Sequence, residues 1–247
     1  MTAFTTSTAL NETQAREEIC RVGKSLFDRG YVHATAGNIS VRLDNGFLIT
    51  PTDACLGFLD PAKLSLLDAH GRHISGDKPS KTIALHRRIY DASVAFDAST
   101  RCVIHTHSTH CVALTLPDND ETATRSSFAV TKELLPPITP YFVMKVGHVP
   151  VIDYHRPGAM EAAEAVAQTI TRYGEQGTPI RAVMLARLGP NVWHHSPATT
   201  MAIMEELEET AKLMHQATHP IAPLSSKQIQ EVRETFGAKW EPRLLLT

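Results

Sequence analysis

Two short apolar segments, residues 39–43 and 47–49, flank the sequence Asp44-Asn45-Gly46. Asparagine followed by glycine readily adopts the positive φ angles of a tight turn, so this pattern predicts an antiparallel β-hairpin. A hairpin this early in the chain favours a sheet that is at least partly antiparallel.

Helical periodicity appears on both sides of this hairpin. Ala15, Ile19 and Val22 recur at helical spacing, and Ser196-Pro197 places a capping serine and a first-turn proline before a long apolar stripe. An early helix that covers strands, followed by later helices, predicts a layered α/β fold. Helices are expected over residues 11–28, 81–95 with Ser80 as the cap, 109–116, 159–173 with a stop at Gly174, 197–216, and from Ser225 or Ser226 to Gly237. Further strands are expected over residues 64–67, 73–75, 102–105, 149–152, 181–186 and 191–194, with a turn at Gly189-Pro190. A long loop is expected over residues 117–140.

The length and composition are those of a globular enzyme or binding protein. The 247 residues are 43% hydrophobic and 20% charged, so one domain is expected over residues 1–247, with a core over about 11–217 and a helical extension over 218–247. The net charge of -2 argues against nucleic acid and anionic membranes as partners. The four cysteines form no Cys-x-x-Cys pair, so we expect them to be reduced thiols. The sequence contains no apolar signal segment and no apolar stretch long enough to span a membrane, so we expect a cytoplasmic location.

The main chemical signal is His105-Thr106-His107, which ends an apolar segment. Side chains at i and i+2 of an extended backbone point to the same face, so the two imidazoles can converge on one ion. Neutral imidazole suits zinc and other divalent transition metals. Surface His-x-His pairs are common by chance, but a pair at the end of a strand favours a cleft at the rim of the sheet.

Three small polar segments, 35–38, 50–52 and 78–81, lie where elements are expected to begin or end. They offer hydroxyls, an amide, backbone N–H groups and ammonium groups. Ser80 and Lys81 are expected at a helix N-terminus, which is a natural phosphate site. Each segment taken alone is also explained by ordinary turn and capping roles.

Several motifs follow one another along most of the chain. They are Gly37-Asn38-Ile39-Ser40, Ile49-Thr50-Pro51-Thr52, Cys55-Leu56-Gly57, Gly76-Asp77-Lys78-Pro79-Ser80-Lys81, His105-Thr106-His107, Ile138-Thr139-Pro140-Tyr141, Val143-Met144-Lys145-Val146-Gly147, Arg156-Pro157-Gly158 and the run from Met204 to Leu213. In order and spacing the chain resembles the class II aldolase/adducin family over roughly residues 15–214, and within it the branch of 3-oxo-tetronate 4-phosphate decarboxylases. The resemblance implies a three-layer α/β/α fold with a mixed, largely antiparallel central sheet, and a homotetramer with sites between subunits.

The resemblance also implies a site and a reaction. Its metal ligands match His105 and His107, and the ion is expected to be zinc first and manganese second. The reaction implied is decarboxylation of a 3-oxo-tetronate 4-phosphate to a ketotriose phosphate and carbon dioxide. The alternatives are a class II sugar-phosphate aldolase and a non-catalytic, adducin-like binding protein. The family's phosphate-binding positions match Thr35, Asn38, Thr52, Ser80 and Lys81.

Three positions depart from the family pattern. Thr82 stands where many members carry a catalytic Glu or Asp, and Asp53 stands where many have glycine. Leu188 stands where the third metal histidine is usual, and leucine cannot ligate a metal. The candidate third ligands are therefore His110, His194 and His195, and substrate oxygens and water can also complete the shell.

The missing carboxylate at residue 82 bears on the choice of reaction. An aldolase or epimerase needs an acid or base near the reacting carbon, whereas a 3-oxo acid forms its carbanion by losing carbon dioxide. Thr82 and Tyr141 are the candidate catalytic residues, Tyr141 as a proton donor. The missing acid and histidine would also suit a scaffold, but a scaffold has no need of the retained histidine pair and phosphate loops.

Overall fold

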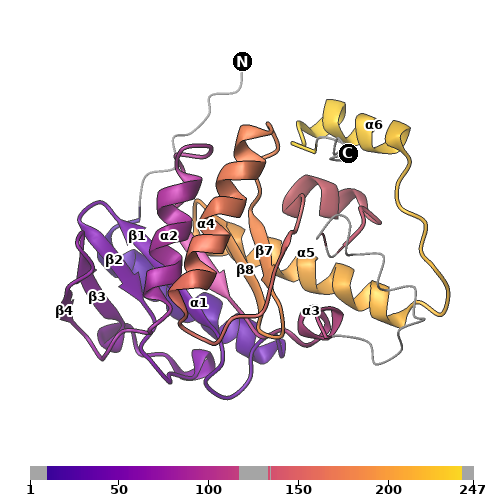
Figure 1. Ribbon diagram of the computed structural model, residues 1–247. Helices are drawn as coiled ribbons and strands as arrows, with labels where there is room; N and C mark the ends of the chain where they lie inside the picture. The colour runs from indigo at the N-terminus through magenta and orange to yellow at the C-terminus, as the bar shows by residue number, and fades with distance from the viewer. Residues whose placement is uncertain (1–9, 117–132, 134, 241–247) are drawn as a thin grey trace.

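The computed structural model describes residues 10–116, 133 and 135–240, and at its centre is a mixed β-sheet (Figure 1). The strand order is β4-β3-β2-β1-β5-β8-β7-β6. Neighbouring strands are antiparallel except β6 and β7, which are parallel, so the predicted mixed and largely antiparallel sheet is confirmed. The strands are β1 Asn38–Leu43, β2 Gly46–Ile49, β3 Ser65–Asp68, β4 His73–Ser75, β5 Cys102–His105, β6 Val151–Ile152, β7 Ala182–Leu185 and β8 Gly189–His194.

The strands β1 and β2 form the predicted hairpin. Leu43 pairs with Gly46, which leaves Asp44 and Asn45 as the two turn residues. The other edge of β1 pairs with β5 in an antiparallel ladder that sets Asn38 opposite His105. Residues far apart in the sequence therefore meet at one end of the sheet.

Helices cover both faces of the sheet, as a three-layer α/β/α arrangement requires (Figure 1). α2 and α4 pack against each other on one face, whereas α1 and α5 lie on the other. None of the helices in the described ranges is long and apolar enough to cross a membrane. The helices are α1 Glu12–Asp28, α2 Ile83–Ser93, α3 Thr109–Leu114, α4 Met160–Glu175, α5 Pro197–Gln216 and α6 Ser226–Phe236, with 3-10 turns η1 Leu56–Phe58 and η2 Pro61–Lys63 and a π-helical turn η4 Phe142–Val146.

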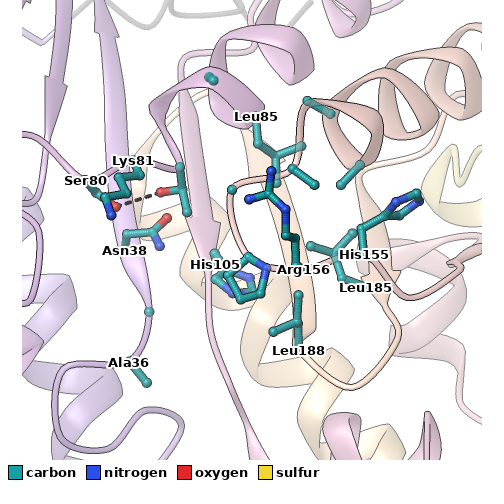
Figure 2. A pocket seen from close by; sticks show the side chains of 18 of the residues that line it. Ala36, Asn38, Ser80, Lys81, Leu85, His105, His155, Arg156, Leu185 and Leu188 are labelled. Carbon is teal, nitrogen blue, oxygen red and sulfur yellow. Dashed lines mark hydrogen bonds between the residues drawn. The ribbon is translucent and has the colours of Figure 1, made fainter.

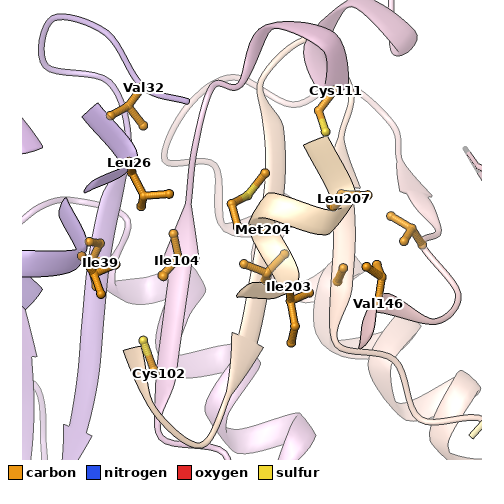
Figure 3. Packing of buried hydrophobic residues seen from close by; sticks show 14 of the residues in the cluster. Leu26, Val32, Ile39, Cys102, Ile104, Cys111, Val146, Ile203, Met204 and Leu207 are labelled. Carbon is orange, nitrogen blue, oxygen red and sulfur yellow. The ribbon is translucent and has the colours of Figure 1, made fainter. Parts of the chain in front are cut away.

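The side chains of β5 alternate between the two helical layers. Ile104 packs in the same buried cluster as Met204 of α5 (Figure 3). Val103 belongs to the opposite cluster, together with Tyr90 of α2. Because side chains alternate along a strand, His105 faces the same layer as Val103. The core on both sides of β5 thus determines which way the first histidine points.

The start of α2 differs from the sequence prediction. The helix begins at Ile83 with Thr82 as its N-cap residue, rather than with Ser80 as the cap. The Ser80 Oγ instead lies 2.9 Å from Thr82 Oγ1. The two hydroxyls therefore form a small polar pair at the entrance to the helix.

The end of α4 also differs, because the helix continues past Gly174 to Glu175. A Cβ atom at Gly174 would lie 2.5 Å from the Phe96 ring, so this glycine allows an aromatic side chain to pack closely against the helix. The glycine serves close packing here and does not stop the helix. Most of the predicted loop over 117–140 lies outside the described residues.

Gly189 and Pro190 belong to β8 and do not form the predicted turn. The turn precedes them, at Arg187, whose φ is 65°. Gly189 has a φ of 111°, and a Cβ atom there would lie 2.3 Å from the carbonyl oxygen of Thr106. The strand can begin at this point only because the residue has no side chain.

We expect Gly189→Ala to destabilise the protein by more than about 2 kcal/mol, because it adds a backbone clash to an unfavourable φ. Gly177→Ala is the matched control, since Gly177 has a φ of 77° with no atom within 4 Å of a built Cβ. The control should cost only about 1–2 kcal/mol of backbone strain. Urea unfolding with unchanged m-values measures both, and equal losses would contradict the close contact with Thr106.

Candidate functional site

A cavity of about 380 Å³ opens where β1 begins and β5 ends (Figure 2). Asn38 and His105, paired across the two strands, both line it. The first turns of α2 and α4 contribute Leu85 and Ala162, and the segment between β6 and α4 contributes Arg156. The cavity therefore lies on the α2 and α4 face of the sheet, the side to which His105 points.

The predicted histidine pair lines this cavity. The ring centroids of His105 and His107 are 4.9 Å apart. His105 is buried, and its Nδ1 lies 2.8 Å from the carbonyl oxygen of Pro190. A carbonyl oxygen only accepts, so Nδ1 carries the hydrogen and Nε2 keeps its lone pair. A backbone carbonyl that accepts from one ring nitrogen in this way orients the other nitrogen toward a metal ion.

Both histidines are held in the neutral form. Burial lowers the pKa of His105 to about 3, and the neighbouring His107 acts in the same direction. Burial and the nearby His33 lower the pKa of His107 as well. Neutral imidazoles are the form that binds metals, so the pair is chemically suited to a divalent cation.

Among the described residues, the predicted positions do not supply a third ligand beside the pair, and the nearest further imidazole is that of His33, whose ring centroid lies 6.5 Å from that of His107. Leu188 lines the cavity and offers no donor atom. His194 lies opposite Cys102, at the other end of the ladder in which Asn191 faces His105. Neither His194 nor His195 lines the cavity, and His110, whose Nδ1 lies 2.7 Å from Glu208 Oε1, does not line it either. Within the described residues, no group of three or more His, Cys, Asp or Glu side chains is placed to hold an ion.

The structure brings the predicted phosphate-binding residues together around the cavity. Asn38 is only 6% exposed, and its Oδ1 has no hydrogen-bond partner among the described residues. A buried amide group without a partner is costly, and a bound ligand would satisfy it. The lining residues with hydroxyl, amide or ammonium groups are Thr35, Asn38, Thr52, Ser80, Lys81 and Thr82.

Asp53 also lines the cavity, beside Thr52. Its φ of 56° lies in the left-handed region, which aspartate tolerates better than most residues but at a cost relative to glycine. This explains why glycine suits the position. The carboxylate adds a negative charge next to the expected phosphate.

Tyr141 lies elsewhere. It immediately precedes the π-helical turn, is 61% exposed and does not belong to the cavity lining. A proton from its phenol cannot reach this cavity within one chain as the structure places it.

Sequence reasoning missed part of the cavity wall. His155 lines the cavity beside Arg156, and Asp153 lies just before them. These residues follow β6, the strand that runs parallel to β7, and precede α4. Ligands often bind beyond the carboxyl ends of parallel strands, so the predicted strand and helix on either side of this segment were the available signal.

A buried hydrogen-bond network behind His105 was missed as well. Ser40 Oγ lies 2.7 Å from His86 Nδ1 and 2.8 Å from the Tyr90 hydroxyl. Burial lowers the pKa of His86 to about 3, and His105 acts in the same direction. The network links β1 to α2 directly behind the cavity, so it holds two of its walls together.

Comparisons with known proteins show what the chain is similar to. The model of the class II aldolase and adducin N-terminal domain matches residues 17–215. A Cupriavidus necator protein named 3-oxo-tetronate 4-phosphate decarboxylase is 48% identical over 234 residues, covering 93% of this chain and 99% of that protein. The crystal structure of Escherichia coli YgbL, described as an aldolase, epimerase or decarboxylase, has a TM-score of 0.75 at 37% identity, covering 90% of this chain and 99% of that one. L-fuculose-1-phosphate aldolase from Thermus thermophilus has a TM-score of 0.63 at 25% identity, covering 84% and 98%.

We expect Asp53→Asn to bind inorganic phosphate about fivefold more tightly than the unchanged protein, because it removes a charge worth about 1 kcal/mol at a partly solvated site. Asp91→Asn, on the exposed side of α2, is the control with the same change in net charge. Calorimetric titration at constant ionic strength measures both. Equal affinity in all three proteins would mean that phosphate does not bind beside Asp53.

Proposed function

The chain belongs to the class II aldolase and adducin family, and from this we propose that it is a metal-dependent carboxy-lyase, which converts a 3-oxo-tetronate 4-phosphate into a ketotriose phosphate and carbon dioxide. The observation that carries the proposal is the meeting of the His105-His107 pair with the phosphate loops in one cavity. The activity named for the Cupriavidus relative fits because the match covers almost the full length of both chains.

The phosphate end of the substrate is assigned to the polar loops. Thr35, Thr52 and Ser80 offer hydroxyls, Asn38 offers its amide, and Lys81 supplies a positive charge. The first turn of α2 adds backbone N–H groups and the positive end of the helix dipole. Lys81 also offsets the negative charge of Asp53.

His105 and His107 would hold one divalent ion, zinc or manganese, with water or substrate oxygens in the remaining positions. Such an ion, when bound, supplies an electrophile for the negative charge that develops as carbon dioxide departs. The pair fits this role as two neutral imidazoles, one of them oriented by Pro190. It is one protein ligand short of the usual catalytic zinc site.

Thr82 suits decarboxylation better than aldol cleavage. In the proposed reaction the bond between C1 and C2 breaks and its electron pair stays on C2, so no base has to remove a proton. Thr82 lines the cavity without charge, whereas a carboxylate there would repel the carboxylate of the substrate. Aldol cleavage lacks the acid or base it needs at this position.

We also propose a homotetramer with sites between subunits, located in the cytoplasm. The exposed position of Tyr141 fits this assembly, because a neighbouring copy would have to bring the phenol to the cavity for it to protonate C2. Water is the other proton source. The four cysteines are free thiols, as a reducing compartment favours.

We expect the purified protein to hold about one divalent ion per chain, and the double variant His105→Ala/His107→Ala to hold none. The same variant should lose more than 100-fold in carbon dioxide release, since ligands of a catalytic metal are removed. His195→Ala is the control and should keep both metal and activity. A metal-free wild-type protein, even after incubation with zinc or manganese, would favour a binding protein over an enzyme.

We expect Thr82→Glu to lower carbon dioxide release at least tenfold, because the new charge opposes binding of a doubly anionic substrate. Thr82→Gln has nearly the same size without the charge and should be less impaired. Steady-state rates over a range of substrate concentrations measure both. Many-fold faster release by Thr82→Glu would overturn the interpretation of Thr82.

A further inference from the structure

Two cationic side chains lie on different walls of the cavity. Lys81 stands beside the phosphate loops at the start of α2, and Arg156 comes from the segment between β6 and α4. In Figure 2, His105 lies between these two walls, with Ser80 and Lys81 on one side of it and Arg156 and His155 on the other. The cavity therefore carries a positive charge on each side of the histidine pair.

Arg156 is free to bind a ligand. Within the described part of the chain, its guanidinium makes no hydrogen bond or ion pair. Asp153 lines the same wall, but no ion pair joins it to Arg156. Other arginines already pair with carboxylates, as Arg88 does with Glu164. An arginine that lines a cavity without a partner is placed for an anion.

The Arg156 side chain is exposed at the open side of the cavity, and the shape of its guanidinium favours a carboxylate as its ligand. Leu85, Leu185 and Leu188 line the same part of the cavity (Figure 2). These side chains leave the guanidinium as the group on this wall that can bind an anion. A guanidinium also presents two parallel N–H groups that match the two oxygens of a carboxylate.

We propose that Arg156 is a specificity-determining residue, which binds the carboxylate of the substrate while Lys81 and the polar loops hold the phosphate. The inference rests on the proposed function, because that reaction requires a substrate with an anion at each end. A sugar-phosphate substrate without a carboxylate would leave Arg156 unpaired. Arg156 thus separates acids from other phosphate esters that the phosphate loops accept equally well.

The chemistry of the step makes this contact temporary. The bond between C1 and C2 breaks, C1 leaves as neutral carbon dioxide, and C2 takes a proton from water or another donor. The ion pair with Arg156 therefore exists with the substrate but not with the ketotriose phosphate. An interaction of this kind lowers KM without raising kcat, because it is stronger in the ground state than in the transition state.

The test compares two ligands that differ only in the carboxylate. Erythronate 4-phosphate lacks the 3-oxo group and so cannot lose carbon dioxide, and erythritol 4-phosphate replaces its carboxylate with an alcohol. By titration calorimetry, we expect the wild-type protein to bind the acid about 10- to 100-fold more tightly than the alcohol. Arg156→Met should lose this preference and keep its affinity for the alcohol.

Three further variants complete the binding experiment. Arg21→Met removes an exposed arginine that pairs with Glu18 on α1, away from the cavity, and should bind like the wild type. Arg156→Lys keeps the charge without the paired N–H groups, and should retain part of the preference. Lys81→Met should weaken both ligands by a similar factor. The proposal is overturned if the wild type shows no preference, if Arg156→Met keeps it, or if Arg156→Met weakens both ligands equally.

A kinetic measurement separates this inference from the proposed function. Arg156→Met should raise KM at least tenfold with little loss of kcat, whereas a structural role would lower kcat as well. If the wild type releases no carbon dioxide but still prefers the acid, the proposed reaction fails and the carboxylate site stands. If it releases carbon dioxide without that preference, the carboxylate site alone fails.

Discussion

The carbonyl group of Pro190 is the point on which the arrangement of the site depends. It accepts the backbone N–H of Thr106 at 3.2 Å and the Nδ1 hydrogen of His105 at 2.8 Å. One atom of β8 thereby holds both the course of the chain after β5 and the orientation of the first histidine. Gly189 makes this approach possible, because any side chain there would meet the Thr106 carbonyl.

The buried clusters on the two faces of the sheet decide which way His105 points. Ile104 is buried among side chains of α1 and α5, and Val103 among those of α2 and α4. These positions set the alternation of β5, so His105 emerges on the side where α2 and α4 begin. Turning the histidine to the other face would require the apolar residues of β5 to exchange layers, which would expose or overpack the core. The same alternation of side chains on β5 therefore packs the core and places His105 in the cavity.

The charged side chains of the cavity lie at its sides rather than at its centre. Thr82 and Leu188 stand where a carboxylate and a third imidazole would be expected from the family pattern, so the centre has fewer titratable groups. The cations lie towards the sides, at Lys81 and Arg156, and His105 lies between them. Such a cavity matches a substrate that is anionic at both ends and loses one of its anionic groups as a neutral gas. It is poorly suited to moving protons at its centre.

Much of this was accessible from the sequence, because local patterns determine local structure. The Asp44-Asn45-Gly46 hairpin, the strand before His105 and the long helix capped by Ser196 are all found where the sequence placed them. The pairing of His105 with His107 follows from strand geometry, and the phosphate loops follow from their positions at element boundaries.

Tertiary structure decided the rest, because it depends on which distant segments become neighbours. The β5–β8 register places His194 at the far end of the ladder from His105, and α4 continues through Gly174, where Phe96 packs closely. The segment after β6 shares the cavity with the histidine pair because the strand order places β8, β7 and β6 next to β5. The sequence by itself therefore determined the chemical groups and the elements that carry them. The order of the strands, which no local pattern encodes, decided which of those groups share a cavity.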